Sequence, residues 1–303
     1  MIQKKRNFIF PFFRNLLLIG NGDILLSIGF MKNNLWCKGA FMTKFQWKTA
    51  VKNCYCFLKT DRLAGAFGLL LLTAAVHLWA QSLVPVWERD SITYVTAATH
   101  WAATGEYLLP VFPPLPCFMV KVLIQLGLQP ETAAKCFTFL TGLPVPLLGY
   151  LIAVKMTGNR RVARYTAFML IFHPMLIYFS VQPLRDSAYI LFVSLLTLAA
   201  VDAVKKQTVV PWLLCALWSA FSWACRFETL EFFLLLPLVA AVRVWQKSYP
   251  LKRALLHLMT YWVCSIVLWI VLTVATGGRE VFVSQYNTYI KHKLTLLVQR
   301  WKN

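Results

Sequence analysis

Two carboxylates, Glu88 and Asp90, flank Arg89 directly after the apolar stretch 63–83. The chain has only 11 acidic residues against 31 Lys and Arg, so two carboxylates within three positions are unusual for it. A carboxylate at a helix end can act as a general base, and a pair of carboxylates can bind a divalent metal ion. We expect Asp90 to be a base. Glu88 is expected to assist it, to bind a metal ion with it, or simply to be solvated.

Two arginines, Arg185 and Arg226, stand at the ends of other apolar stretches. A guanidinium donates two parallel hydrogen bonds to a phosphate, so both are candidates for holding one. Each also has an acidic neighbour as an alternative partner, Asp186 for Arg185 and Glu228 for Arg226. Lys121 is a third candidate for the phosphate, with anchoring at the membrane interface as its alternative.

The composition places these residues in a membrane protein. Hydrophobic residues make up 59% of the 303 residues, charged residues only 14%, and the mean hydropathy is +0.60. The net charge of +20 comes from short Lys and Arg clusters between apolar stretches, which is typical of cytoplasmic loops rather than of nucleic-acid binding. The sequence therefore predicts an all-α polytopic membrane protein.

Seven apolar stretches are expected to cross the membrane. They are residues 63–83, 132–153, 162–179, 187–201, 209–224, 232–244 and 255–275. Basic clusters precede the first stretch and follow the second, fourth and sixth, so these connections are predicted to be cytoplasmic. An eight-span alternative would count residues 115–126 as well, but it would place the cluster at Arg160 and Arg161 outside.

This topology puts most carboxylates on the outer side of the membrane. They are Glu88, Asp90, Glu106, Glu131, Asp186, Glu228, Glu231 and Glu280. Solvation of loop ends explains part of this asymmetry, and a shared outward-facing polar site would explain the rest. The first outer connection, residues 84–131, is predicted to contain two juxtamembrane helices, at 91–104 and 115–126. Ser91 or Asp90 should cap the first of them, and Gly105 should end it.

Three regions follow from this pattern. Residues 1–62 form a basic N-terminal segment, interfacial or disordered in part, and the native start is open between Met1, Met31 and Met42. Residues 63–275 are predicted to form the membrane module. Residues 276–303 are predicted to lie on the outer side and to be the start of a region that is missing from this sequence. The eight cysteines show no spacing typical of a metal site or a disulfide framework.

Several short pieces, in this order and on this topology, resemble the GT-C class of polyprenyl-phosphate-sugar glycosyltransferases, in particular its protein mannosyltransferase and aminoarabinose transferase group. The pieces are Asp90 with Tyr94, Gly105-Glu106-Tyr107, Phe112-Pro113-Pro114-Leu115, Gly158-Asn159-Arg160-Arg161, His173-Pro174 and Arg185-Asp186-Ser187-Ala188-Tyr189. Phe112 and Pro116 replace the His and Gly of the mannosyltransferase motif. The chain also has fewer spans than its relatives, which predicts a truncated form.

The resemblance implies inverting transfer of a sugar from a polyprenyl phosphate to a hydroxyl of a glycan, lipid or protein acceptor, without nucleic acid. Asp90 would be the general base, assisted by Glu88. Arg185, Arg226 and Lys121 would bind the donor phosphate, and Asp186, Glu228 and Tyr94 would support them. No cofactor is certain, and a divalent metal ion near Asp90 is an option. The implied location is a bacterial inner membrane, with the site facing the periplasm or the exterior.

A non-catalytic protein is the alternative, either a translocator of lipid-linked sugars or an inactive remnant of such an enzyme. A translocator should carry polar residues deep in several spans. The predicted spans contain few, which favours chemistry at the outer surface over passage through the membrane.

Overall fold

The computed structural model describes residues 62–83, 87–109 and 112–285. The chain divides into two units, Met1–Lys59 and Thr60–Asn303, and every described residue belongs to the second. The predictions for residues 1–61 and 286–303 lie outside the described residues. The side chains of residues 62–64, 227, 230, 277–282 and 285, which include Glu280, lie outside them as well.

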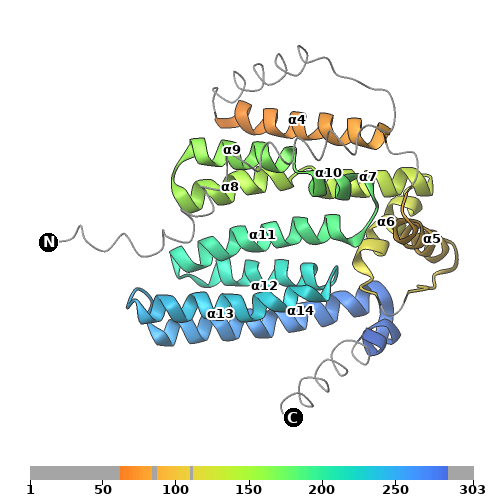
Figure 1. The fold of residues 1–303 in the computed structure, drawn as a ribbon. Coiled ribbons are helices and arrows are strands. Elements are labelled where there is room, and N and C mark those ends of the chain that lie inside the picture. The colour runs from red at the N-terminus through yellow and green to blue at the C-terminus, as the bar shows by residue number, and fades with distance from the viewer. Residues whose placement is uncertain (1–61, 84–86, 110–111, 286–303) are drawn as a thin grey trace, which may run out of the picture. The chain divides into compact units, whose positions relative to one another are not determined.

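The described part of the chain is helical and contains no strand. Four segments are long and apolar enough to cross a membrane, namely Gly65–Leu83, Pro130–Thr157, Arg185–Lys206 and Leu251–Thr276. They correspond to α4 (Arg62–Leu83), α7 (Pro130–Gly142) with α8 (Val145–Thr157), α11 (Arg185–Lys206), and most of α14 (Leu251–Gln285) (Figure 1). The chain is therefore an integral membrane protein, and the part that the structure describes is all-helical, as predicted.

The count of seven spans is not confirmed. Residues 209–224 and 232–244 form α12 (Val209–Trp223) and α13 (Leu230–Trp245), which have 15 and 16 residues. Helices of this length span about 22–24 Å, less than the roughly 30 Å of a bilayer core. The predicted stretch 162–179 is divided into α9 (Arg160–Ile171) and α10 (Pro174–Val181), which are bent by 50° and would add a fifth span only as a pair.

Proline explains where the two apolar stretches are interrupted. Pro144 and Pro146 stand at the start of α8, and Pro174 opens α10. Proline has no backbone N–H and its ring clashes with the preceding turn, so it kinks a helix or, as at these positions, stands where one helix ends and the next begins.

Two short helices fill the first long connection, as expected. They are α5 (Arg89–Thr104) and α6 (Leu115–Gln125). Gly105 ends α5 with a φ of 82°, a left-handed conformation that glycine adopts without steric cost. The predicted start is wrong: the N-cap residue is Glu88, so Asp90 lies in the first turn and neither Asp90 nor Ser91 caps the helix.

The connections rich in Lys and Arg lie at one end of the helix bundle, and the connections that carry most of the acidic residues lie at the other end. The α8–α9, α11–α12 and α13–α14 connections lie at one end (Figure 1). There Lys155 Nζ lies 2.6 Å from Asp202 Oδ2, and Gln207 donates a hydrogen bond to the Ser248 carbonyl. The α10–α11 and α12–α13 connections meet at the other end, where Arg226 pairs with Asp186. The basic clusters are thus gathered as the predicted topology requires.

Buried polar side chains form a stripe on α4. Thr73, His77 and Gln81 are spaced by four residues and therefore share one helix face. Thr73 and His77 are buried, and the Gln81 amide donates to the Lys135 and Ser180 carbonyls and to the Thr138 hydroxyl. The expectation that the spans contain few polar residues is wrong for this helix, because hydropathy averaged over a stretch hides a polar stripe on one face.

Candidate functional site

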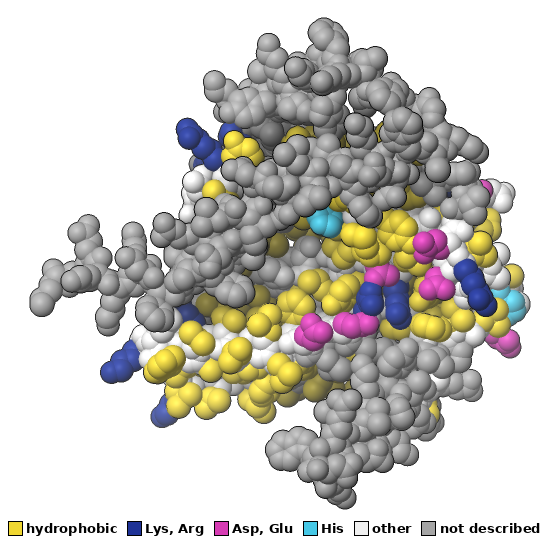
Figure 2. Space-filling view, viewed as in Figure 1, with side chains coloured by type: hydrophobic (Ala, Val, Ile, Leu, Met, Phe, Trp, Pro, Cys, Tyr) yellow, Lys and Arg dark blue, Asp and Glu magenta, His cyan; other side chains and the backbone are white. Residues whose placement is uncertain are grey.

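Charged side chains from three parts of the chain gather at the end of the bundle opposite the basic connections. They come from the start of α5, the start of α11, and the short helix η3 (Phe227–Thr229) with the residue before it. Figure 2 shows acidic and basic side chains together on this face, beside a broad hydrophobic surface. We call this group, comprising Glu88, Asp90, Arg185, Asp186, Arg226 and Glu228, the polar cluster.

Gln182, in the connection between α10 and α11, fixes the start of α5. Its side-chain oxygen accepts hydrogen bonds from the Glu88 backbone N–H at 3.0 Å and from the Ser91 hydroxyl at 2.9 Å. Gln182 is 5% exposed and Ser91 is fully buried. The carboxylates of Glu88 and Asp90 remain exposed, so this anchor orients them while leaving them accessible.

Arg226 is held by two carboxylates. Its Nη2 and Nε atoms donate to Glu228 at 3.0 and 3.2 Å, its Nη1 donates to Asp186, and its guanidinium lies 5.6 Å from the centre of the Tyr189 ring. The hydrogen bonds from Arg226 hold the pKa of Glu228 below its ordinary value. The Arg226–Glu228 pair expected from the sequence therefore forms, and Asp186 joins it.

Arg185 is the available cation of the polar cluster. Its guanidinium lies 5.6 Å from the centre of the Phe112 ring, and no described carboxylate lies within ion-pairing distance of it. The alternative pair with Asp186 does not form, because Asp186 bonds to Arg226 instead. A cation that stacks on an aromatic ring and has no carboxylate partner suits an anionic ligand.

Tyr94 connects α5 to Arg185. Its ring packs edge-on against Phe112, with 6.1 Å between the ring centres. Burial raises the pKa of Tyr94 to about 12, and the charge of Arg185 opposes this shift, whereas Asp90 and Asp186 add to it. The Tyr94 hydroxyl therefore stays protonated at neutral pH, in the field of the residues predicted to act on a substrate.

Lys121 lies apart from this arrangement. Its Nζ atom lies 4.5 Å from the centre of the Trp101 ring and 5.8 Å from that of Phe118, within the aromatic packing of α5 and α6. No described contact joins it to the arginines of the polar cluster. Its interfacial alternative fits this position better than phosphate binding.

A metal ion near Asp90 stays a prediction. Among the described residues, no group of three or more His, Cys, Asp or Glu side chains is arranged to hold a metal ion. The five described cysteines, Cys117, Cys136, Cys215, Cys225 and Cys264, are unbridged. Burial raises the pKa of the Cys117 thiol to about 12, so it is not a nucleophile at neutral pH.

Sequence reasoning missed Gln182, Phe112 and Tyr189 as parts of the site. A lone glutamine between two helices gives no signal, because its partners Glu88 and Ser91 lie more than 90 positions away. Phe112 was expected only as part of the family-like piece Phe112-Pro113-Pro114-Leu115, although the Arg185 guanidinium lies 5.6 Å from the centre of its ring.

No protein-family model and no curated protein matches this chain.

Replacing Gln182 by Leu should loosen the start of α5. The Glu88 N–H and the Ser91 hydroxyl would both lose their acceptor, at a cost of about 1–3 kcal/mol in the free energy of unfolding. Hydrogen–deuterium exchange should show faster exchange over residues 88–95. Gln182→Glu keeps the acceptor but buries a carboxylate beside Glu88, so its exchange should fall between the wild type and Gln182→Leu. Gln129→Leu, at an exposed glutamine whose side chain makes no capping bond, is the matched control.

Proposed function

We propose that the chain transfers a sugar from a polyprenyl-phosphate donor to an acceptor hydroxyl on the non-cytosolic side of a membrane. One observation carries the proposal: Arg185, which has no carboxylate partner among the described residues, acts on Tyr94 together with the accessible carboxylate of Asp90. The cluster is at the end of the bundle opposite the basic connections, and the positive-inside rule supports assigning that end to the outer side.

The chemistry requires a base and a stabilised leaving group. Asp90 would take the proton of the acceptor hydroxyl as its oxygen attacks the anomeric carbon of the sugar. The bond between that carbon and the phosphate oxygen breaks, and Arg185 would stabilise the charge left on the lipid phosphate. Arg226, Asp186 and Glu228 would hold Arg185 in place through the start of α11, and Glu88 would assist Asp90. Inversion at the anomeric carbon follows from the family resemblance.

The membrane arrangement belongs to the same proposal. Seven crossings require α12, α13 and the bent pair α9–α10 to cross the membrane in addition to the four long spans. Residues that flank these shorter helices would then lie within the membrane interface. We place the site on the periplasmic or outer face of a bacterial inner membrane, where a lipid-linked donor can approach laterally between the helices.

The test is a transfer assay with the purified full chain in lipid nanodiscs. Radiolabelled polyprenyl-phosphate sugars and candidate glycan, lipid or protein acceptors are supplied, and release of lipid phosphate is measured. Consumption of a donor supports the proposal. If no donor is consumed with any acceptor, the alternative of an inactive remnant or a translocator gains, and a flipping assay with fluorescent lipid-linked sugars separates these two.

Arg185→Gln should raise the KM for the donor by about 10- to 100-fold, because one or two charge-assisted hydrogen bonds to the phosphate are lost. Lys121→Gln is the matched control and should leave the KM within about twofold. If Lys121→Gln raises the KM and Arg185→Gln does not, the phosphate site lies between α5 and α6 instead.

A further inference from the structure

A small cavity lies beside α4, where α4 contacts the broken helix pairs α7–α8 and α9–α10. Its lining comes from α4, α7, α8, α9, α10 and α11, and it has a volume of about 10 Å³. The lining includes His77, Gly142, Val145, Ser180 and Ser187. It is lined by the apolar helices, and one lining residue, Ser187, directly follows Asp186 of the polar cluster.

His77 is the key residue of this cavity. It is 3% exposed, and its Nδ1 atom is buried without a hydrogen-bond partner among the described residues. An imidazole nitrogen buried without a partner costs about 1–3 kcal/mol. Polar groups inside a bilayer are normally hydrogen-bonded or functional, so we expect this nitrogen to bind a small ligand.

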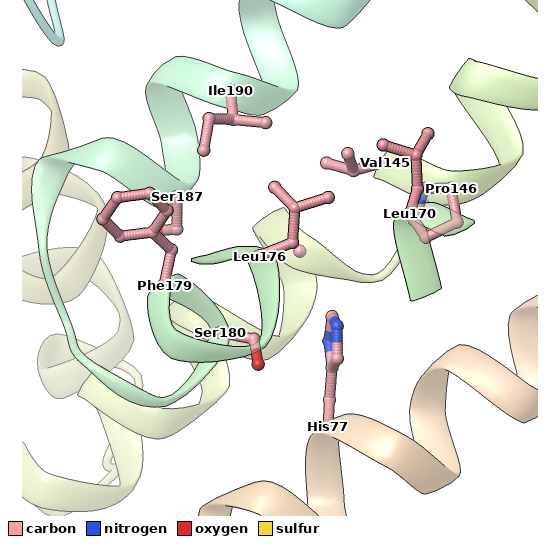
Figure 3. A pocket seen from close by; sticks show the side chains of 10 residues that line it. His77, Val145, Pro146, Leu170, Leu176, Phe179, Ser180, Ser187 and Ile190 are labelled. Carbon is pink, nitrogen blue, oxygen red and sulfur yellow. The ribbon is translucent and has the colours of Figure 1, made fainter. Parts of the chain in front are cut away.

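The local structure keeps the imidazole against the cavity. A Cβ atom at Gly142 would lie 2.9 Å from His77 Cε1 and 3.5 Å from Ser180 Cβ, so only glycine leaves room for the ring. In Figure 3 the His77 imidazole and Ser180 lie on one side of the cavity, with Val145, Leu170 and Ile190 on the other. His77 and Ser180 thus form one polar part of the lining, and Ser187 lies beside Phe179.

Ser180 and Ser187 supply the remaining polar atoms. Each hydroxyl donates its hydrogen to a backbone carbonyl, Ser180 to Ile177 at 2.7 Å and Ser187 to Leu184 at 3.1 Å. Their oxygen lone pairs therefore remain able to accept a hydrogen bond. A ligand that donates to a serine oxygen and bonds to His77 Nδ1 would satisfy both.

We propose that this cavity binds a single water molecule, held by His77 Nδ1 and the Ser180 hydroxyl. A volume of about 10 Å³ admits one water and nothing larger, and a buried water needs two to four polar partners. Water can serve either tautomer of His77, because it both donates and accepts. The water would link α4 to α7–α8 and to α9–α10. Each of the three polar residues of the α4 stripe would then have a hydrogen-bond partner.

A cavity-filling substitution separates a bound water from a dry cavity. Val145→Ile adds one carbon atom to the lining of the cavity. If it expels the water, the Tm of the full chain in detergent or nanodiscs should fall by about 2–4 °C. In the His77→Leu background the acceptor is gone, so the same substitution should leave the Tm unchanged or raise it. Val263→Ile, on an exposed position of α14, is the control for the added carbon.

Two outcomes would overturn the proposal. A rise in Tm for Val145→Ile alone means that the cavity is dry, because filling an empty apolar cavity stabilises a protein. An equal fall in both backgrounds means that the added carbon simply overpacks the site. A high-resolution density map gives an independent readout, with a peak expected about 3 Å from His77 Nδ1 and from Ser180 Oγ.

Discussion

Replacing Asp90 by Asn should reduce the rate of sugar transfer by about 100- to 10,000-fold while the protein stays folded. The amide has the shape of the carboxylate but cannot take up the proton of the acceptor hydroxyl. Asp90 is exposed in the first turn of α5 and makes no described side-chain hydrogen bond. Losing its negative charge near the helix N-terminus should cost only about 0.3–1 kcal/mol of stability. The measurement is the turnover number with saturating donor.

Two further substitutions decide how the result is interpreted. Glu106→Gln changes an exposed carboxylate beyond the end of α5 and should leave the rate unchanged. Glu88→Gln should lower the rate less than Asp90→Asn does, because Glu88 is assigned only an assisting role. If Glu88→Gln abolishes transfer and Asp90→Asn does not, the two carboxylates exchange roles. Full activity in both variants would exclude either residue as the base.

The helix positions could be predicted because apolar stretches in this chain are bounded by clear signals. Gly105 ends α5 as expected, and the α8–α9, α11–α12 and α13–α14 connections, which carry basic clusters, lie at one end of the bundle. The predicted stretch 187–201 is α11, which extends to Arg185–Lys206 because its polar flanks continue the helix. Such boundaries depend on local residues, which a sequence displays directly.

The breaks between α7 and α8 and between α9 and α10 were not predicted, because hydropathy does not take account of how proline affects the backbone. Pro144 and Pro174 lie inside apolar stretches and leave the average hydropathy high, but each removes a backbone donor and ends a helix. The start of α5 was misjudged for a related reason. Ser91 has the chemistry of a cap, but its hydroxyl is used by Gln182, a tertiary partner that no local pattern reveals.

The pairing of the arginines shows what adjacency in sequence cannot predict. Neighbouring residues on a helix point about 100° apart, so Arg185 and Asp186 face different partners. Asp186 faces Arg226, whereas Arg185 faces Phe112. The residue types of the site could therefore be predicted from the sequence. Which arginine pairs with a carboxylate depends on the rotation of α11 about its axis relative to α12 and the connection after α12.

Arg226→Gln should lower the free energy of unfolding by about 1–3 kcal/mol. Removing one partner of a buried ion pair costs about 3–5 kcal/mol, and exposed pairs contribute about 0–1 kcal/mol. The Arg226 and Asp186 side chains are 26% and 16% exposed, and Glu228 is 47% exposed, so this network lies between the two cases. Denaturant unfolding in mixed micelles measures the difference. Arg226→Lys should recover only part of it, because the ammonium cannot reproduce the two bonds to Glu228.

The pH dependence of this loss identifies its source. Arg226 lowers the pKa of Glu228 from its ordinary value of 4.5, so the pair stabilises the folded state above that pH and loses its contribution as the pH falls through the lowered value. The difference between wild type and Arg226→Gln should therefore be constant near neutral pH and shrink in acid. A double-mutant cycle with Asp186→Asn should give a larger coupling than one with Glu228→Gln, since Asp186 is the more buried partner. A difference that persists unchanged in acid would mean that Arg226 acts through its packing on Tyr189 rather than through its ion pairs.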